Sequence, residues 1–148
     1  PSVEAALQTL IPASTVAVAH IRRGDFAGYN YPLVSRASYV RAAREIGFDE
    51  RDILFVSEEE PATHPDFAGE LAMVPDFFRL AKATTLLRAN SSFSFWAGAI
   101  AQANQNARVF SPVIEGLRGG IEHDCAFVPG NGARIADIDF VEAIVIQP

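Results

Sequence analysis

Short apolar runs alternate with segments of helical periodicity along this chain, and this alternation constrains the fold more than any other feature. Residues 15–22 form a run of β-branched and small apolar side chains that ends before Gly24, which favours a buried strand. Apolar side chains recur at helical spacing over residues 38–46, and Gly47 is a suitable helix stop. Residues 52–57 are again a short apolar run. The sequence therefore predicts a strand, a helix and a second strand, which together form a βαβ unit.

The alternation continues through the rest of the chain. The patterns predict a helix at 74–83, a strand at 84–89, a helix at 93–104, a strand at 108–111, a strand at 125–128, a turn at 129–132 and a last strand at 140–146. No internal repeat or linker interrupts these segments. We therefore expect a single α/β domain over residues 1–148, with a Rossmann-like, open and mostly parallel sheet that has helices on both faces.

Composition narrows the classes of function. The formal net charge is −6 and the isoelectric point is near 5.0, which disfavours broad nucleic-acid binding because a phosphate backbone needs a positive protein face. Cys125 is the single cysteine, so no intrachain disulfide holds the fold and a reducing cytoplasm is allowed. No apolar run reaches the roughly 18 residues of a membrane span. We expect a soluble cytoplasmic protein of bacterial type, without a membrane span.

The motif His20-Ile-Arg-Arg-Gly-Asp25 is the first candidate site, because it lies where a predicted buried strand runs into a glycine turn. Ligands of open α/β sheets bind beyond the carboxyl ends of the strands. Strand alternation places His20 and Arg22 on one face and Arg23 on the other. An arginine fork can bind a diphosphate and neutralise the charge of a departing nucleoside diphosphate. The alternative is a plain ion pair between an arginine and Asp25.

The acidic motif Ser57-Glu-Glu-Glu60 ends the second predicted strand and is the next candidate. An ionised carboxylate only accepts hydrogen bonds, whereas guanine presents N1–H and an amino group side by side. One glutamate could therefore bind guanine and reject adenine. The alternative is a solvated acidic loop.

The motif Asn90-Ser-Ser-Phe-Ser-Phe-Trp96 is a strand-to-helix junction rich in hydroxyl groups. Backbone N–H groups and the dipole at a helix N-terminus favour phosphate, and Ser91, Ser92 or Ser94 could add donors. The alternative is helix capping by Asn90 or Ser91. The aromatic side chains of the motif fit a packing role better than stacking on a ligand: Phe93, Phe95 and Trp96.

The three motifs together carry a family resemblance. HIRRGD, FVSEE and ANSSFSFW, in this order, resemble the three conserved blocks of the α-1,2-fucosyltransferases and their bacterial relatives. More distantly they are similar to the α-1,6- and protein O-fucosyltransferases. Residues 38–46 and 76–83 also resemble the connecting helices of that family, so the resemblance covers residues 16–112, about two-thirds of the chain.

The resemblance implies one half of a two-domain glycosyltransferase of the GT-B type, namely the C-terminal half that binds a GDP-sugar donor. It implies that Arg22 contacts the diphosphate and that His20 lies near the nucleoside. It further implies that Glu58 or Glu59 holds guanine. The donor-binding residues expected from the resemblance are His20, Arg22, Arg23, Ser57, Glu58, Glu59, Asn90, Ser91, Ser92, Phe93 and Ser94, and the expected catalytic residues are Arg22 and Asp25.

The leading hypothesis for the activity is inverting transfer of fucose, or of a related deoxysugar, from GDP-fucose to a glycan hydroxyl, without a metal or another cofactor. Only some fifteen residues precede the first predicted strand, so we expect the acceptor-binding half to be missing from this chain. The expected partners are the GDP-sugar, a glycan acceptor, and either a second copy of the chain or a separate acceptor-binding half.

Two other hypotheses stay open, so the sequence leaves it undecided whether the chain is an enzyme. The first is a non-catalytic module of the same fold that binds a GDP-sugar or nucleotide without turnover. The second is a structural α/β domain in which Arg22, Asp25 and Glu58 only form ion pairs.

Several shorter patterns are weaker indications of function. Asp137-Ile-Asp139 matches a metal-binding triplet of another glycosyltransferase class, but such triplets are frequent by chance. His123 and Cys125 could lie on one strand face, yet no further ligand cluster accompanies them. His64 is expected in a surface loop, and the glycines at 116–120 lack the setting of a dinucleotide-binding fold.

Overall fold

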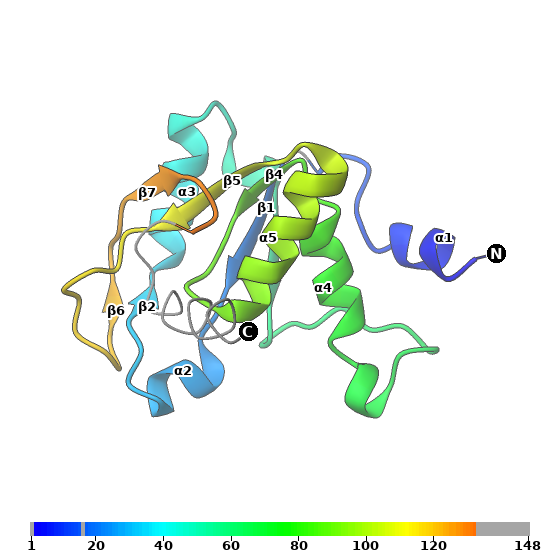
Figure 1. Cartoon of the computed structure of the whole chain (residues 1–148), viewed down its shortest axis with the longest axis horizontal. Helices are drawn as coiled ribbons and strands as arrows, with labels where there is room; N and C mark the ends of the chain where they lie inside the picture. Colours follow the sequence, from blue (N-terminus) through cyan, green and yellow to red (C-terminus); the bar gives the residue numbers. More distant parts are fainter. Residues whose placement is uncertain (1, 16, 133–148) are drawn as a thin grey trace, which may run out of the picture.

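The computed structural model, which describes residues 2–15 and 17–132, is built around a five-stranded sheet (Figure 1). The strands lie in the order β3 (Ile53–Ser57), β1 (Ala17–Ile21), β4 (Thr85–Leu87), β5 (Arg108–Pro112) and β7 (Phe127–Pro129). The first four are parallel to their neighbours, and β7 pairs antiparallel with β5 at the edge. The predicted α/β fold with an open, mostly parallel sheet is therefore confirmed.

Helices cover both faces of the sheet, and each face has its own hydrophobic core. On one face α3 (Arg36–Glu45) closes a core of buried residues that includes Ala19, Ile21, Tyr39, Ala42, Ala43 and Leu87. On the other face α4 (Val74–Ala81) and α5 (Ser92–Gln105) close a core that includes Val18, Val56, Leu80, Leu86, Ala97 and Val109. Neighbouring residues of β1 thus face opposite cores, as strand geometry requires.

Serine caps set where two of the helices begin. The side chain of Ser35 accepts a hydrogen bond from Ser38 N at 3.2 Å, so α3 starts at Arg36, two residues before the predicted start. Ser91 does the same for α5, accepting from Ser94 N at 3.3 Å. Capping by Ser91 was one of the alternatives for this junction, and it is present.

Short elements are the ones that the sequence pattern did not predict. They are α1 (Val3–Gln8), α2 (Gly24–Gly28), and a small parallel sheet formed by β2 (Leu33–Val34) and β6 (Glu122–His123). A two-residue strand has no periodicity to detect, and its pairing joins segments that are far apart in the sequence.

The last described strand also begins later than predicted. Cys125 N donates to Ser38 Oγ at 2.8 Å, which ties residue 125 to α3 rather than to the sheet, and β7 starts at Phe127. The turn predicted at 129–132 contains Gly130 with a φ of 115°. The strand predicted at 140–146 lies outside the described residues.

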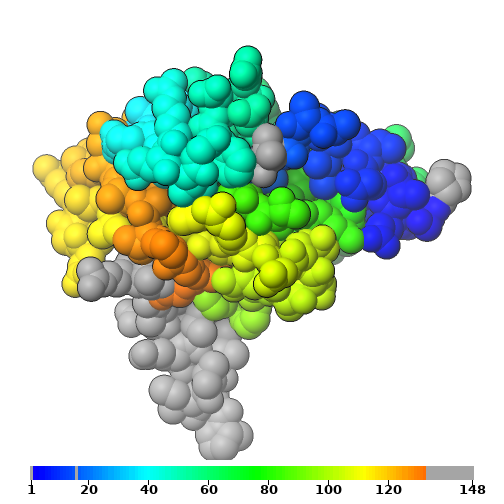
Figure 2. Space-filling model, turned by 90° about the horizontal axis from the view of Figure 1, so that it is seen from above, coloured from blue at the N-terminus to red at the C-terminus, as the bar shows by residue number. Residues whose placement is uncertain are grey.

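The N-terminal segment and residues 113–128 lie at opposite ends of the molecule, coloured blue and yellow to orange in Figures 1 and 2. The N-terminal helix α1 is attached to α4, because Lys82 Nζ pairs with Glu4 Oε1 at 2.6 Å and Arg79 Nε donates to Leu10 O at 3.0 Å. In the part of the chain that the structure describes, no helix combines the length and the apolar character that crossing a membrane requires.

Candidate functional site

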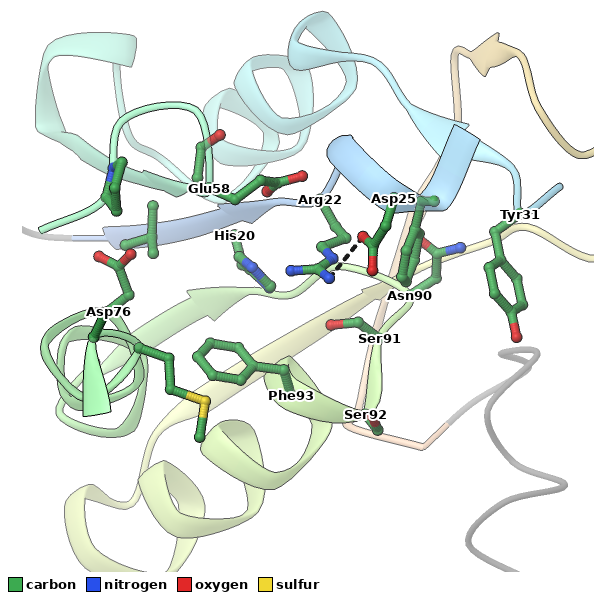
Figure 3. Close-up of a pocket in the computed structure, with 16 residues that line it drawn as sticks. His20, Arg22, Asp25, Tyr31, Glu58, Asp76, Asn90, Ser91, Ser92 and Phe93 are labelled. Carbon is green, nitrogen blue, oxygen red and sulfur yellow. Dashed lines mark hydrogen bonds and ion pairs between the residues drawn. The ribbon is translucent and has the colours of Figure 1, made fainter. Parts of the chain in front are cut away.

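A pocket of about 810 Å³ opens at the carboxyl ends of β1, β3 and β4 (Figure 3). The chain runs from β1 through α3 to β3 on one side, then through α4 to β4 on the other side of β1. The strand order therefore reverses beside β1, and such a switch point is where open α/β sheets bind ligands. The pocket occupies the position that the fold itself favours for a small-molecule site.

Most of the predicted site residues meet in this pocket. Those that line it are His20, Arg22, Asp25, Ser57, Glu58, Asn90, Ser91, Ser92 and Phe93. They come from three strand ends and from the first turns of α2 and α5. The sequence motifs, which lie up to seventy residues apart, are thus brought together by the parallel sheet.

Three predicted donor-binding residues do not line the pocket. Arg23 turns to the opposite side of β1, where its side chain pairs with Glu122. Glu59 is exposed and lines a separate pocket of about 320 Å³ on that side, together with Arg23. Ser94 is fully buried, and its Oγ is engaged with Ala89, from whose N–H it accepts at 2.9 Å.

Arg22 brings a positively charged guanidinium, which donates hydrogen bonds, to the lining of the pocket. Its Nη2 pairs with Asp25 Oδ1 at 2.7 Å, and its guanidinium lies 5.3 Å from the centre of the Phe26 ring. Among the described residues there is no hydrogen-bond partner for the buried Nε of Arg22. The ion pair that the sequence left as an alternative is therefore present, and it leaves part of the guanidinium directed at the pocket.

His20 forms part of the pocket floor. It is 3% exposed, and its ring lies 5.6 Å from that of Phe93. Burial, and then the positive charges of Arg22 and Arg88, lower the pKa of His20 to about 3, so the ring is neutral near pH 7. Its Nδ1 is buried without a hydrogen-bond partner within residues 2–15 and 17–132.

Glu58 points back at the start of α2. Its Oε1 accepts a hydrogen bond from the backbone N–H of Arg23 at 2.6 Å. Its Oε2 is buried, and the described part of the chain offers it no hydrogen bond. The carboxylate therefore contacts the backbone between Arg22 and Asp25, and no sequence pattern predicts this contact.

The N-terminus of α5 is held in place by hydrogen bonds from the buried Arg88. Arg88 is fully buried and donates from Nη1 to Ser91 O at 3.1 Å and from Nε to Ser111 Oγ at 3.1 Å. Asn90 Nδ2 donates to Pro32 O at 3.2 Å, which fixes the junction against the segment that carries Tyr31. Ser92, the first residue of the helix, is exposed to the pocket. The first turn of α5 is thus a fixed set of N–H and hydroxyl donors.

Asp76 is a pocket residue that the sequence analysis missed. It lies on α4, is 8% exposed, and accepts from Ala62 N at 3.0 Å through Oδ1. Burial raises the pKa of Asp76, although the Ala62 N–H and Arg79 act in the opposite direction. The only sequence signal was a carboxylate in a helix otherwise suited to cover the sheet, and that signal does not indicate a binding role.

The aromatic residues of the third motif divide between packing and exposure. Phe93 and Phe95 pack against the two cores, in agreement with the expectation, although Phe93 also lines the pocket. The expectation was wrong for Trp96, which is 45% exposed because it lies on the outer face of α5, as does Ile100 one turn later.

The structure does not place the residues of the weaker sequence patterns that it describes in a binding or metal site. His123 Nε2 lies 2.7 Å from Arg118 O, and Cys125 Sγ lies 3.6 Å from His123 O, so both side chains face local backbone. His64 lies in the loop before α4, beside Phe67. Within the described ranges no group of three or more metal-ligating side chains is found, and Asp137 and Asp139 lie outside those ranges.

Comparison with known proteins gives no match: no family model, no curated protein and no solved structure is similar to this chain at a significant level.

Proposed function

We propose that this chain binds the donor of a GDP-sugar-dependent glycosyltransferase, with GDP-fucose as the first candidate, and that it transfers the sugar with inversion to a glycan hydroxyl. The observation that carries the proposal is the meeting of the partly exposed guanidinium of Arg22 and the N-terminus of α5 in one pocket. A guanidinium fork and a helix N-terminus are the two groups that proteins most often use for a diphosphate. The resemblance to the fucosyltransferases supports the same assignment.

The diphosphate fits the middle of the pocket. Figure 3 shows Arg22 between His20 and Asp25, and Ser91 lines the same pocket. Phosphate oxygens there would accept from the exposed part of the Arg22 guanidinium, from the first N–H groups of α5 and from the hydroxyl of Ser92. These donors are already fixed by the ion pair to Asp25 and by Arg88 behind the helix, so binding requires little reorganisation.

The base fits the end of the pocket that Asp76 and Met73 line. Figure 3 places Asp76 and Tyr31 at opposite ends of the pocket, with Arg22 between them. Asp76 Oδ1 already accepts from Ala62 N, and an ionised Asp76 has further acceptor sites for the N1–H and amino group of guanine. Adenine lacks this pair of donors. We therefore assign guanine recognition to Asp76, in place of the Glu58 or Glu59 that the resemblance implied.

The sugar then lies towards Asp25 and Tyr31. Transfer requires an acceptor hydroxyl to attack the anomeric carbon while GDP departs and the hydroxyl proton passes to a base. Arg22 would stabilise the charge that builds up on the departing diphosphate, which is an interaction stronger in the transition state than in the ground state. The acceptor must be held by other residues, because transfer depends on its orientation against the donor.

Binding without transfer is the second candidate, and one contact favours it. Asp25 lines the pocket and is already paired with Arg22 at 2.7 Å. Oδ1 of Asp25 is thus engaged by the guanidinium and is not available to take the proton of an acceptor hydroxyl. In this case the chain would bind GDP-sugars and release them unchanged.

The test replaces Arg22 and measures ligand affinity. Arg22→Ala should weaken GDP binding by about 10- to 100-fold, which corresponds to the loss of one or two hydrogen bonds to a charged group. Arg51→Ala is the matched control, because Arg51 is an exposed arginine on the 3-10 turn before β3 and does not line the pocket. Isothermal titration calorimetry gives the affinities, and circular dichroism confirms that each variant is folded. A folded Arg22→Ala variant with wild-type affinity for GDP would falsify the proposal.

A further inference from the structure

We infer that Glu58 is a positioning residue, which holds the backbone between Arg22 and Asp25 and so aims Arg22 at the diphosphate. This inference rests on the proposed function for the identity of the ligand. Glu58 follows β3, and Ser57 pairs with Ile21 in the register of β1 and β3. Glu58 and Arg22 are therefore the next residues on two adjacent parallel strands, which brings the carboxylate to the start of α2.

The first turn of α2 is held by Glu58 rather than by its own cap. Arg23 is the residue before the helix, its φ and ψ are −130° and −88°, and its side chain makes no capping hydrogen bond. Glu58 Oε1 accepts from Arg23 N at 2.6 Å instead. A carboxylate that accepts a backbone N–H at a helix start makes a charge-assisted hydrogen bond, which is stronger than a neutral one.

Gly24 makes room for this carboxylate. A Cβ on Gly24 would lie 2.8 Å from Glu58 Oε1 and 3.3 Å from its Cγ, so any larger residue would displace the Glu58 side chain. Gly28, at the other end of the same helix, has no described residue within 4 Å of its Cβ position. A larger residue at Gly24 would thus move Glu58 from its contact, and Gly28 at the other end of α2 provides a matched control.

The residues held by Glu58 lie between the two charges of the pocket. Arg23 and Gly24 connect Arg22 to Asp25, and the ion pair of 2.7 Å closes over them. The side chain of Arg23 is fixed on the far side by Glu122. Without Glu58 the backbone N–H of Arg23 would lose its hydrogen bond. The turn would then no longer fix the direction of the Arg22 guanidinium. The base end of the pocket, at Asp76 on α4, would not change.

A direct role in binding the base makes a different prediction. Guanosine has the base but no phosphate, whereas GDP has both. If Glu58 acts through Arg22, its loss weakens GDP binding and spares guanosine. If Glu58 contacts guanine, its loss weakens the binding of guanosine and of GDP by the same factor.

The experiment compares guanosine and GDP by calorimetry for the wild type, Glu58→Ala and Gly24→Ala. Both variants should bind GDP about tenfold more weakly and guanosine within about twofold of the wild type. Glu58→Ala should add no further loss to Arg22→Ala, and Gly24→Ala none to Glu58→Ala, because each pair acts through one contact. Glu60→Ala and Gly28→Ala, which change the same residue types nearby, should leave both affinities unchanged. Equal losses for guanosine and GDP, or additive double variants, would overturn the inference.

Hydrogen exchange separates a failure of this inference from a failure of the proposed function. In the ligand-free protein, the amide of Arg23 should exchange at least about tenfold faster in Glu58→Ala and Gly24→Ala than in the wild type, while the amides of β1 keep their rates. If the wild type binds neither guanosine nor GDP, the proposed function fails, and the positioning contact is still decided by this measurement. Unchanged exchange at Arg23 in Glu58→Ala would show that Glu58 does not hold the turn.

Discussion

At the scale of single residues, the candidate site contains several buried polar atoms that make no hydrogen bond within the described part of the chain. Within the described residues, three such buried atoms belong to the pocket: His20 Nδ1, Arg22 Nε and Glu58 Oε2. Buried polar groups in proteins are almost always paired, so each exception needs an explanation. All three belong to residues that line the pocket, so unsatisfied polar groups of the described structure concentrate around this site.

The buried His20 makes the stability of the fold depend on pH. In the unfolded chain this histidine has a pKa near its ordinary value of 6.5, whereas in the fold its pKa is about 3. The unfolded state alone therefore gains a proton as the pH falls below 6.5, and the fold loses stability there. The contribution is fully present above this pH and declines by up to about 1.4 kcal/mol per pH unit below it.

We predict that His20→Asn removes this part of the pH dependence. Urea unfolding at about pH 7 and about pH 5 should give a larger loss in the free energy of unfolding for the wild type than for the variant, by roughly 1 to 2 kcal/mol. His64→Asn, in the loop before α4, is the control and should behave like the wild type. If the free energy of unfolding fell equally between these two pH values in the wild type and in His20→Asn, the buried, neutral state of His20 would be contradicted.

Residues that follow strand ends could be predicted as site residues, and Asp76 could not. His20, Arg22 and Ser91 were predicted because parallel strands bring their carboxyl ends to one edge. Asp76 reaches the pocket from the side of a helix, so its role depends on how α4 is turned against the sheet. That orientation follows from packing of the two cores and not from any local pattern.

At the scale of elements, the parallel strands of the main sheet and the helices that cover it follow the sequence pattern, and the peripheral elements do not. The strands β1, β3, β4 and β5 and the helices α3, α4 and α5 all lie where the sequence predicts them. The sequence predicts a glycine turn where the five-residue α2 lies. This short helix depends on Glu58 and on contacts with residues near 120, which its own sequence does not reveal. Elements held by distant contacts give little signal in their own sequence.

Gly119 provides one of these distant contacts. A Cβ on Gly119 would lie 1.6 Å from the backbone oxygen of Asn30, so the segment after α2 and the segment before β6 touch backbone to backbone. The neighbouring Gly120 N donates to Tyr31 O at 2.9 Å. The position of Tyr31 at the rim of the pocket therefore depends on glycine at 119.

We predict that Gly119→Ala destabilises the fold by about 1 to 3 kcal/mol, because the backbone must move to admit the methyl group. Gly132→Ala is the control, since no atom of residues 2–15 and 17–132 lies within 4 Å of that Cβ position. Thermal unfolding followed by circular dichroism measures both variants. If Gly119→Ala unfolded at the wild-type temperature, the packing of these two segments would be different from the one described.

At the scale of the whole molecule, the order of the strands decides where the site lies. The sequence predicted strands and helices but not that β1 lies between β3 and β4, since the order depends on which face each connecting helix covers. That order produces the switch point beside β1 and the pocket at its end. The fold thus brings together three polar motifs, and the resemblance to one family rests on those same motifs.

The most direct test of the central claim is a calorimetric titration of the chain with GDP, GDP-fucose, ADP and UDP. The account predicts that GDP and GDP-fucose bind at least about tenfold more tightly than ADP and UDP, because Asp76 accepts from the donor edge of guanine. Asp76→Asn should remove this preference and retain the fold. Binding of ADP or UDP as tightly as GDP, or no binding of GDP and GDP-fucose, would contradict it.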